Sequence, residues 1–227
     1  AVETANTVYV RQTDAAGNVS AASSLSFTLD TAASAFTLAL ACDSATAGDK
    51  ISSNASLALS GVEAGAVVSY SSNGGISWSN TFAAVEGANT VSVRTTDVAG
   101  NERIQDLAFT WLKTKPLAPL LTLVCDSGLS GSDAITHTDT LQISTATGTT
   151  LLFSTDAATW TNTFTAIEGA NTVYARAMDA AGNLSDTSVL AFTLDITAPL
   201  PVNISLTCDS GSSNSDKISQ TGVLAVS

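Results

Sequence analysis

Few side chains could take part in catalysis or metal binding, and they recur at a fixed spacing. Cys42, Cys125 and Cys208 lie 83 residues apart, and each is followed directly by Asp-Ser. A second aspartate follows the first after six or seven positions in all three places. Because catalysis and metal binding need several such groups close together in space, the elements that position them have to be considered next.

Catalysis finds little support in these residues. His137 is the only histidine, and it lies in the polar stretch AITHTDT, where we expect it to be exposed. No HExxH, CxxC or phosphate-cradling glycine loop is present. Glu86 and Glu168 could be general acids, but each stands in an EGAN turn that recurs with the repeat, and catalytic sites are rarely copied into every unit of an array. We therefore predict that the protein is not an enzyme.

Internal repetition explains the spacing. ETANTVYVRQTDAAGN begins at Glu3, EGANTVSVRTTDVAGN at Glu86 and EGANTVYARAMDAAGN at Glu168, so that the starts lie 83 and 82 residues apart. A fixed period of this size indicates an array of like domains. We predict the C-terminal part of a repeat over 1–30, whole repeats over 31–113 and 114–196, and the N-terminal part of a repeat over 197–227. The chain is then expected to be a fragment of a longer tandem protein.

Composition narrows the class of partner. Twenty acidic residues against eight basic ones give a net charge of -12, which argues against nucleic acid and against insertion into, or binding to, an anionic membrane. Hydrophobic residues make up 44% and charged residues only 12%, as in small all-β domains whose outer faces carry hydroxyl groups.

Alternating hydrophobicity predicts strands almost throughout a repeat. The fold class expected is all-β, with tandem immunoglobulin-like β-sandwich domains of about 83 residues in a linear array. Asn73-Gly74 is predicted to form a hairpin turn with positive φ at both positions. The seven strands expected in the first whole repeat are Phe36–Cys42, Ala55–Leu59, Val67–Ser71, Ile76–Ser79, Thr81–Val85, Thr90–Thr95 and Asp106–Trp111.

The same alternation makes predictions for cysteine and tryptophan. Leu38, Leu40 and Cys42 fall on one face of a strand, so each cysteine is expected to be buried as a small hydrophobe. One cysteine per repeat excludes a disulfide within a repeat. Trp78 and Trp160 occupy matching positions, and we expect them to anchor the core rather than to stack on a sugar.

Several motifs together carry a resemblance. They are the D-x-G-x-S-x-x-D loop from Asp209, the Tyr-Ser hairpin that leads to Trp78, the EGANTV run, the D-x-A-G-N turn and the linker FTLDITAP from Phe192. This set resembles the bacterial immunoglobulin-like repeats of large surface adhesins and biofilm-associated proteins. The resemblance implies a secreted, extracellular rod at the bacterial cell surface, which spaces a terminal adhesive domain and is often stiffened by calcium at the domain joints.

Strand order gives the implied calcium a place. If successive strands alternate in direction, the loops after the first, third and fifth strands meet the last turn of the next repeat. Ca²⁺ takes six to eight oxygen ligands at about 2.3 to 2.6 Å, and carboxylates from two domains would supply some of them. The alternative also stays open that these aspartates only stabilise turns, because aspartate is a common turn residue. The candidate calcium ligands are Asp126, Asp133, Asp195, Asp43, Asp49, Asp179, Asp30 and Asp97.

The linker between the two whole repeats departs from the pattern. It reads FTWLKTKPLAP, so that Leu112 replaces the aspartate of FTLD, and Lys113 and Lys115 add positive charge. We expect little or no calcium at this joint. Trp111 and Leu112 would pack against the next domain, or Leu112 would merely continue the last strand.

Two functions follow from these expectations. The favoured one is a non-catalytic extender segment of an adhesin, which contacts neighbouring repeats while other domains of the parent protein contact cell or abiotic surfaces. The alternative is a module that binds carbohydrate or a cell surface, or an accessory domain of a secreted enzyme. A binding module predicts an aromatic or polar pocket in one repeat that its neighbour lacks.

Overall fold

The computed structural model describes residues 2–210, 212–213 and 215–227. These residues form sixteen β-strands and no helix, so none of them belongs to a helix that could cross a membrane. The chain divides into two compact units. The first comprises residues 2–122, 142–164 and 173–190, and the second comprises the described residues of 123–141, 165–172 and 191–227.

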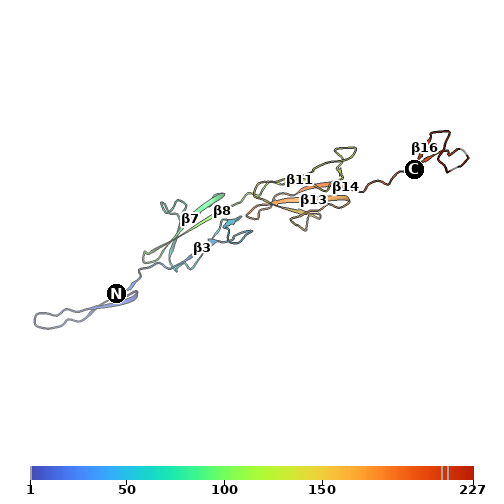
Figure 1. The fold of residues 1–227 in the computed structure, drawn as a ribbon. Coiled ribbons are helices and arrows are strands. Elements are labelled where there is room, and N and C mark those ends of the chain that lie inside the picture. Colours follow the sequence, from blue (N-terminus) through green and yellow to red (C-terminus); the bar gives the residue numbers. More distant parts are fainter. Residues whose placement is uncertain (1, 211, 214) are drawn as a thin grey trace. The chain divides into compact units, whose positions relative to one another are not determined.

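The first whole repeat contains two sheets within the first unit. β3 (Thr37–Leu40) pairs antiparallel with β5 (Leu57–Ser60). The second sheet has the order β4-β8-β7-β6, in which β7 and β8 run side by side over their whole length (Figure 1). Its strands are β4 (Ile51–Ser52), β6 (Val67–Ser71), β7 (Gly87–Thr96) and β8 (Glu102–Trp111).

Apolar residues from both sheets form the core of this repeat. Val91 and Val93 of β7 are fully buried, and each such side chain contributes roughly 1.5–3 kcal/mol by leaving water. They pack with Phe36, Leu107 and Phe109. Partly buried residues of β3 and β5 pack against the same cluster, namely Leu38, Leu40, Leu57 and Leu59. Two facing sheets with one core make the repeat an immunoglobulin-like β-sandwich.

The second whole repeat has the same strand pairing. β9 (Leu120–Leu123) lies beside β11 (Leu141–Ser144). The larger sheet has the order β10-β14-β13-β12. Its strands are β10 (Ile135–Thr136), β12 (Thr150–Ser154), β13 (Gly169–Met178) and β14 (Ser188–Leu194). Four strands remain: β1 (Thr4–Val10) pairs with β2 (Ser23–Leu29), and β15 (Ile204–Leu206) pairs with β16 (Leu224–Val226).

The predicted strands are confirmed in part. Val67–Ser71 is a strand with the predicted bounds, but Ile76–Ser79 is reduced to one bridge between Tyr70 and Ser79. Thr81–Val85 forms no strand. Its end is fixed instead by Asn89, whose side chain accepts a hydrogen bond from the N–H of Val85 and donates to the Val85 carbonyl. The short β4, parallel to β8, was not predicted.

The predictions that the cysteines are buried and that Trp78 and Trp160 anchor the core are wrong. All three cysteines are free and exposed, because the strand of Cys42 already ends at Leu40. Trp78 and Trp160 are half-buried outside the core, beneath the guanidinium groups of Arg94 and Arg176 at 4.3 and 3.9 Å from the ring centroids.

Two further local predictions have different outcomes. His137 is exposed, as expected. In the hairpin turn the positive φ angles fall on Gly74 and Gly75, at 70° and 85°, and not on Asn73. The Asn73 side chain instead accepts hydrogen bonds from the Ser71 hydroxyl and the Ser77 amide.

Candidate functional site at the linkers

The glutamate that opens each EGANTV-type run holds the linker that follows its repeat. Glu86 Oε1 accepts hydrogen bonds from the amides of Lys113 and Thr114 at 3.0 and 2.7 Å, and Oε2 accepts from the Thr114 hydroxyl at 2.9 Å. These bonds, above all the one from the Thr114 amide, lower the pKa of Glu86. Glu3 binds Thr31 and Glu168 binds Ile196 and Thr197 in the same way.

Sequence reasoning missed this role of the glutamate. The signal was available, because Thr31, Thr114 and Thr197 recur with a period of 83. Each threonine lies 28 or 29 residues after its glutamate, so only the folded chain brings the pair together.

The D-x-A-G-N turns are closed by their own side chains. Asp179 Oδ1 accepts from the amides of Ala181 and Asn183, both at 2.9 Å, and Oδ2 accepts from Asn183 Nδ2 at 2.8 Å. Asp97 is bound by Asn101 in the same way, and the hydrogen bond from the Asn101 side chain is the main reason that the pKa of Asp97 is lowered. The aspartates therefore act as turn-forming residues here.

The asparagine of each turn also reaches the end of the preceding repeat. Asn183 Nδ2 donates to the carbonyl of Leu112 at 2.8 Å, and Asn101 Nδ2 donates to the carbonyl of Asp30 at 3.2 Å. Both bonds span 71 residues and lie within the first unit. Because the acceptor is a backbone carbonyl, the contact survives the replacement of aspartate by leucine at position 112. Leu112 also prolongs the pairing of β8, since its amide donates to the carbonyl of Ser52 at 3.0 Å.

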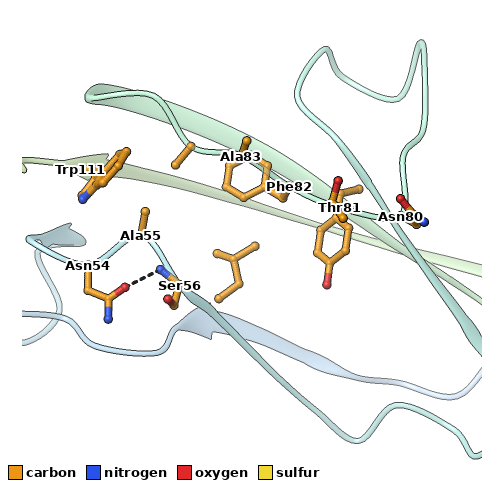
Figure 2. Close-up of a pocket in the computed structure, with 11 residues that line it drawn as sticks. Asn54, Ala55, Ser56, Asn80, Thr81, Phe82, Ala83 and Trp111 are labelled. Carbon is orange, nitrogen blue, oxygen red and sulfur yellow. Dashed lines mark hydrogen bonds between the residues drawn. The ribbon is translucent and has the colours of Figure 1, made fainter.

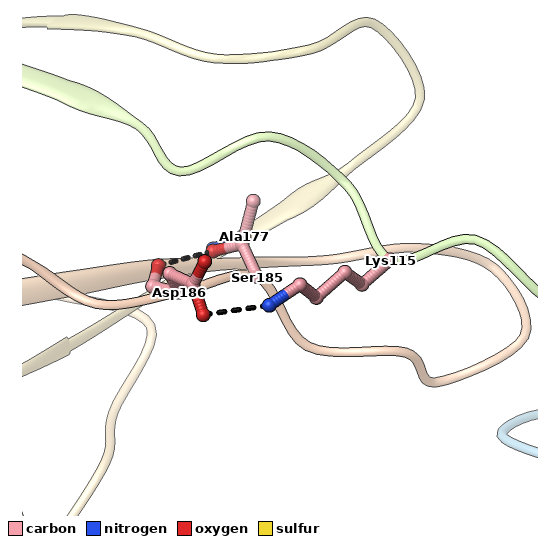
Figure 3. A network of polar contacts seen from close by, with 4 residues as sticks. All are labelled: Lys115, Ala177, Ser185 and Asp186. Carbon is pink, nitrogen blue, oxygen red and sulfur yellow. Dashed lines mark hydrogen bonds and ion pairs between the residues drawn. The ribbon is translucent and has the colours of Figure 1, made fainter.

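Further contacts of the first unit join the same segments. Ser44 Oγ donates to the carbonyl of Ala181 at 2.8 Å, and a Cβ at Gly182 would lie 3.5 Å from that of Ala45. Lys115 Nζ pairs with Asp186 at 2.7 Å (Figure 3). Both of these side chains are largely exposed, so the ion pair contributes only about 0–1 kcal/mol.

Four predicted calcium ligands act as caps of local turns. Asp30, Asp49, Asp133 and Asp195 each accept a hydrogen bond from the amide two residues further along the chain. Within residues 2–210, 212–213 and 215–227, no three acidic, histidine or cysteine side chains come together as a group that could hold a metal ion.

One observation nevertheless fits a cation. Asp43, Asp126 and Asp209, the aspartates that follow the cysteines, each use Oδ2 to accept a backbone amide of the same loop. Their Oδ1 atoms are buried and find no hydrogen-bond partner among the described residues. A buried carboxylate oxygen without a partner is costly, and a cation ligated by that oxygen would remove the cost. Asp43 and Asp126 therefore remain predicted calcium ligands.

A pocket lies in the first whole repeat, between β5 and the segment that follows β6 (Figure 2). Its volume is about 700 Å³. Trp111 stands at one end and Asn80 at the other, as Figure 2 shows. The remaining lining residues are Asn54, Ala55, Ser56, Leu57, Tyr70, Thr81, Phe82, Ala83 and Ala84.

Fold and linker contacts together define the class of protein, an array of immunoglobulin-like β-sandwich repeats.

No family profile matches the sequence, and no curated protein matches it. Among solved structures, the chain is similar to fibronectin(III)-like modules of Clostridium thermocellum CbhA, with 15% identity, a TM-score of 0.39, and coverage of 71% of this chain and 94% of that one. It is also similar to a tetra-tandem repeat in the extending region of a large adhesion protein, with 17% identity and a TM-score of 0.29. That match covers 91% of this chain and 60% of the other.

Proposed function

We propose that the chain is a non-catalytic extender segment of a large bacterial surface adhesin, built from immunoglobulin-like repeats of the biofilm-associated type. The observation that carries this proposal is the recurrent asparagine contact. Asn101 and Asn183 each bind the carbonyl at the end of the preceding repeat. Because this contact is copied with the repeat, it would connect each repeat of an array to the next one.

The glutamate contacts support the same function. A linker of a few residues is flexible unless its backbone is bound, because each free residue retains conformational entropy. Glu86 removes that freedom for Lys113 and Thr114. Glutamate then fixes the linker to the preceding repeat, and asparagine fixes the following repeat to it. An extender needs this restriction of bending, while it needs no catalytic group.

The proposed setting is extracellular. The parent protein would contact cell or abiotic surfaces through other domains, and these repeats would contact each other. The net charge of -12 suits a surface-exposed array, since like charge opposes self-association.

Small-angle X-ray scattering of the chain tests the proposal. Replacement of Asn183 by alanine removes the bond to Leu112, and we expect a scattering profile typical of a more flexible chain. Asn18→Ala is the matched control, because Asn18 caps its turn through Asp14 in the same way but makes no hydrogen bond to a linker among the described residues. Identical profiles for the Asn183 variant and the original chain would contradict the extender function.

We also propose that calcium stiffens the array through the loops that contain Asp43 and Asp126. For Asp43, this proposal replaces the expectation of little or no calcium at the joint between the two whole repeats. The support is the buried, unpartnered Oδ1 of each side chain. Ca²⁺ would be the partner that this negatively charged oxygen lacks. Loop carbonyls and water would complete the coordination of the ion.

A further inference from the structure

We propose that the pocket of the first whole repeat binds a neutral saccharide. This activity goes beyond the extender function, because it would give one repeat of the array a ligand of its own. It rests on the shape of the pocket, on the chemistry of its walls and on a difference between the two whole repeats.

The pocket exists because the expected fifth strand does not form. β5 pairs with β3 on one side only, while residues 81–84, which would have paired with its other side, form no strand. The space between them opens over partly buried core residues, among them Leu57 and Phe82. It is thus a groove with an apolar floor, and its volume of about 700 Å³ lies within the usual range of small-molecule sites, about 300–1,000 Å³.

Aromatic side chains give the groove a surface for sugar rings. Trp111 is half-buried, and its Nε1 donates to the carbonyl of Ser53 at 3.1 Å. This bond holds the indole in place without using its π face. Tyr70 is also half-buried and lines the same space. The C–H face of a pyranose is apolar and packs on such rings, whereas its hydroxyl groups need polar partners.

Polar groups on the walls supply those partners. Asn80 is exposed, and its side chain makes no hydrogen bond to any residue that the structure describes. Asn54 uses Oδ1 to accept from the Ser56 amide at 2.9 Å, and its amide nitrogen has no hydrogen-bond partner among the described residues. The hydroxyl groups of Ser56 and Thr81 add donors and acceptors.

Charge favours an uncharged ligand. None of the residues that line the pocket is Asp, Glu, Lys or Arg, although the whole chain has a net charge of -12. An extended peptide could in principle pair with the free edge of β5. That edge does not set the first repeat apart, since β11 likewise pairs only with β9. The aromatic and amide side chains do set it apart, so a sugar is the better fit.

The second whole repeat has different residues at the equivalent places. Trp111 pairs with Ser52 at the end of β8, and Leu194 pairs with Thr136 at the end of β14. Tyr70 and Phe153 each form the bridge that precedes the pocket segment. Counting back from β5 and β11, Thr138 and Asp139 replace Asn54 and Ala55. The second repeat thus loses the indole, the phenol and one amide, and gains a negative charge.

The other tryptophans do not offer the same surface. Arg94 lies over the ring of Trp78, and Arg176 lies over the ring of Trp160. A cation over the ring occupies the face on which a sugar would stack. Trp111 has only the more distant Lys113, at 5.8 Å from its ring centroid.

The test is a titration of the intact chain with neutral oligosaccharides, followed by tryptophan fluorescence and by calorimetry. The probes are β-1,4-linked oligomers of glucose, of N-acetylglucosamine and of mannose, and a galactose disaccharide. We expect saturable binding of at least one probe, and we expect Trp111→Leu to weaken it by about tenfold or more, because aromatic anchors dominate such contacts. Leucine is the natural residue at this position in the second repeat, so the variant is compatible with the fold.

Two controls make the outcome decisive. Asn54→Thr introduces another residue of the second repeat and should weaken binding as well, whereas Thr138→Asn in the second repeat should leave it unchanged. Asn183→Ala should also leave it unchanged, so the extender function and the saccharide site can fail separately. The proposal is overturned if no probe binds up to the millimolar range, or if Trp111→Leu binds as well as the original chain.

Discussion

A single glutamate in each repeat shows how much one residue contributes to this array. Glu86 binds two amides and one hydroxyl group of its linker, and its pKa is therefore lowered. A carboxyl group whose pKa is lower in the folded than in the unfolded state stabilises the fold above the unfolded value. That stabilisation disappears as the pH falls through the lowered value.

We predict that Glu86→Gln lowers the free energy of unfolding at pH 7. The free energy of unfolding of the variant should also depend less on pH. The difference between the original chain and the variant should shrink as the pH falls below the ordinary glutamate value of 4.5. Urea denaturation between pH 7 and pH 3 measures it. Asp106→Asn is a suitable control, because the Asp106 side chain is exposed. A difference that does not change with pH would show that the linker bonds of Glu86 do not depend on its charge.

Backbone conformation imposes a second requirement at the next residue. Gly87 has a φ of 98°, which side chains other than hydrogen rarely adopt. We predict that Gly87→Ala lowers the free energy of unfolding by about 1–3 kcal/mol. Gly131→Ala is the matched control, because a Cβ at Gly131 meets no atom within 4 Å and its φ is not positive. Thermal denaturation of both variants gives the comparison, and equal losses would contradict the prediction.

β4 and β10, the two shortest strands, are elements that sequence reasoning missed. β4 contains only Ile51 and Ser52, and it pairs parallel with β8. Ser52 is fully buried. Its hydroxyl group donates to the carbonyl of Cys42 at 2.6 Å and accepts from the amide of Asn54 at 3.0 Å. The Ser52 side chain thus binds the backbone both before and after β4.

We predict that Ser52→Ala costs about 1–3 kcal/mol of stability, because the Cys42 carbonyl and the Asn54 amide lose the partner that the buried hydroxyl group gives them. Ser53→Ala changes the exposed neighbour and should be nearly neutral. Chemical denaturation of the two variants measures the contrast. If Ser52→Ala were as stable as Ser53→Ala, the hydroxyl bonds would not hold this loop.

At the scale of the whole molecule, calcium binding would connect the loops to the stiffness of the array. After chelator treatment, we predict saturable calorimetric binding of Ca²⁺ in physiological salt, with a dissociation constant of about 10⁻³ M or tighter. Asp43→Asn and Asp126→Asn should each remove one site. Asp139→Asn, in an exposed loop, should remove none. Absence of heat throughout the millimolar range would eliminate the calcium mechanism and leave the extender function intact.

Much of the fold could be predicted from the sequence, because a strand leaves a local signal. Hydrophobic residues at alternate positions, Val91 and Val93, mark β7, and the recurrence of EGANTV marks the period of the repeat. The bounds of β6 were predicted without error. The domain boundaries at 31–113 and 114–196 remain predictions.

The site could be predicted only in part. The turns of Asp97 and Asp179 were located, but not the bonds by which their asparagines reach Asp30 and Leu112. The fifth strand was predicted from a suitable alternation over Thr81–Val85, yet the side chain of Asn89 binds the backbone there instead. Such competition depends on atoms that the alternation does not describe.

The sequence alone determined that the protein is an all-β array with a period near 83 residues, because repetition and alternation are properties of neighbouring residues. The tertiary structure decided which residues join the repeats, which cysteines are exposed and where a pocket opens. These features depend on pairs that lie 28 to 71 residues apart, such as Glu86 with Thr114 and Asn183 with Leu112. Only the folded backbone brings such pairs within hydrogen-bonding distance.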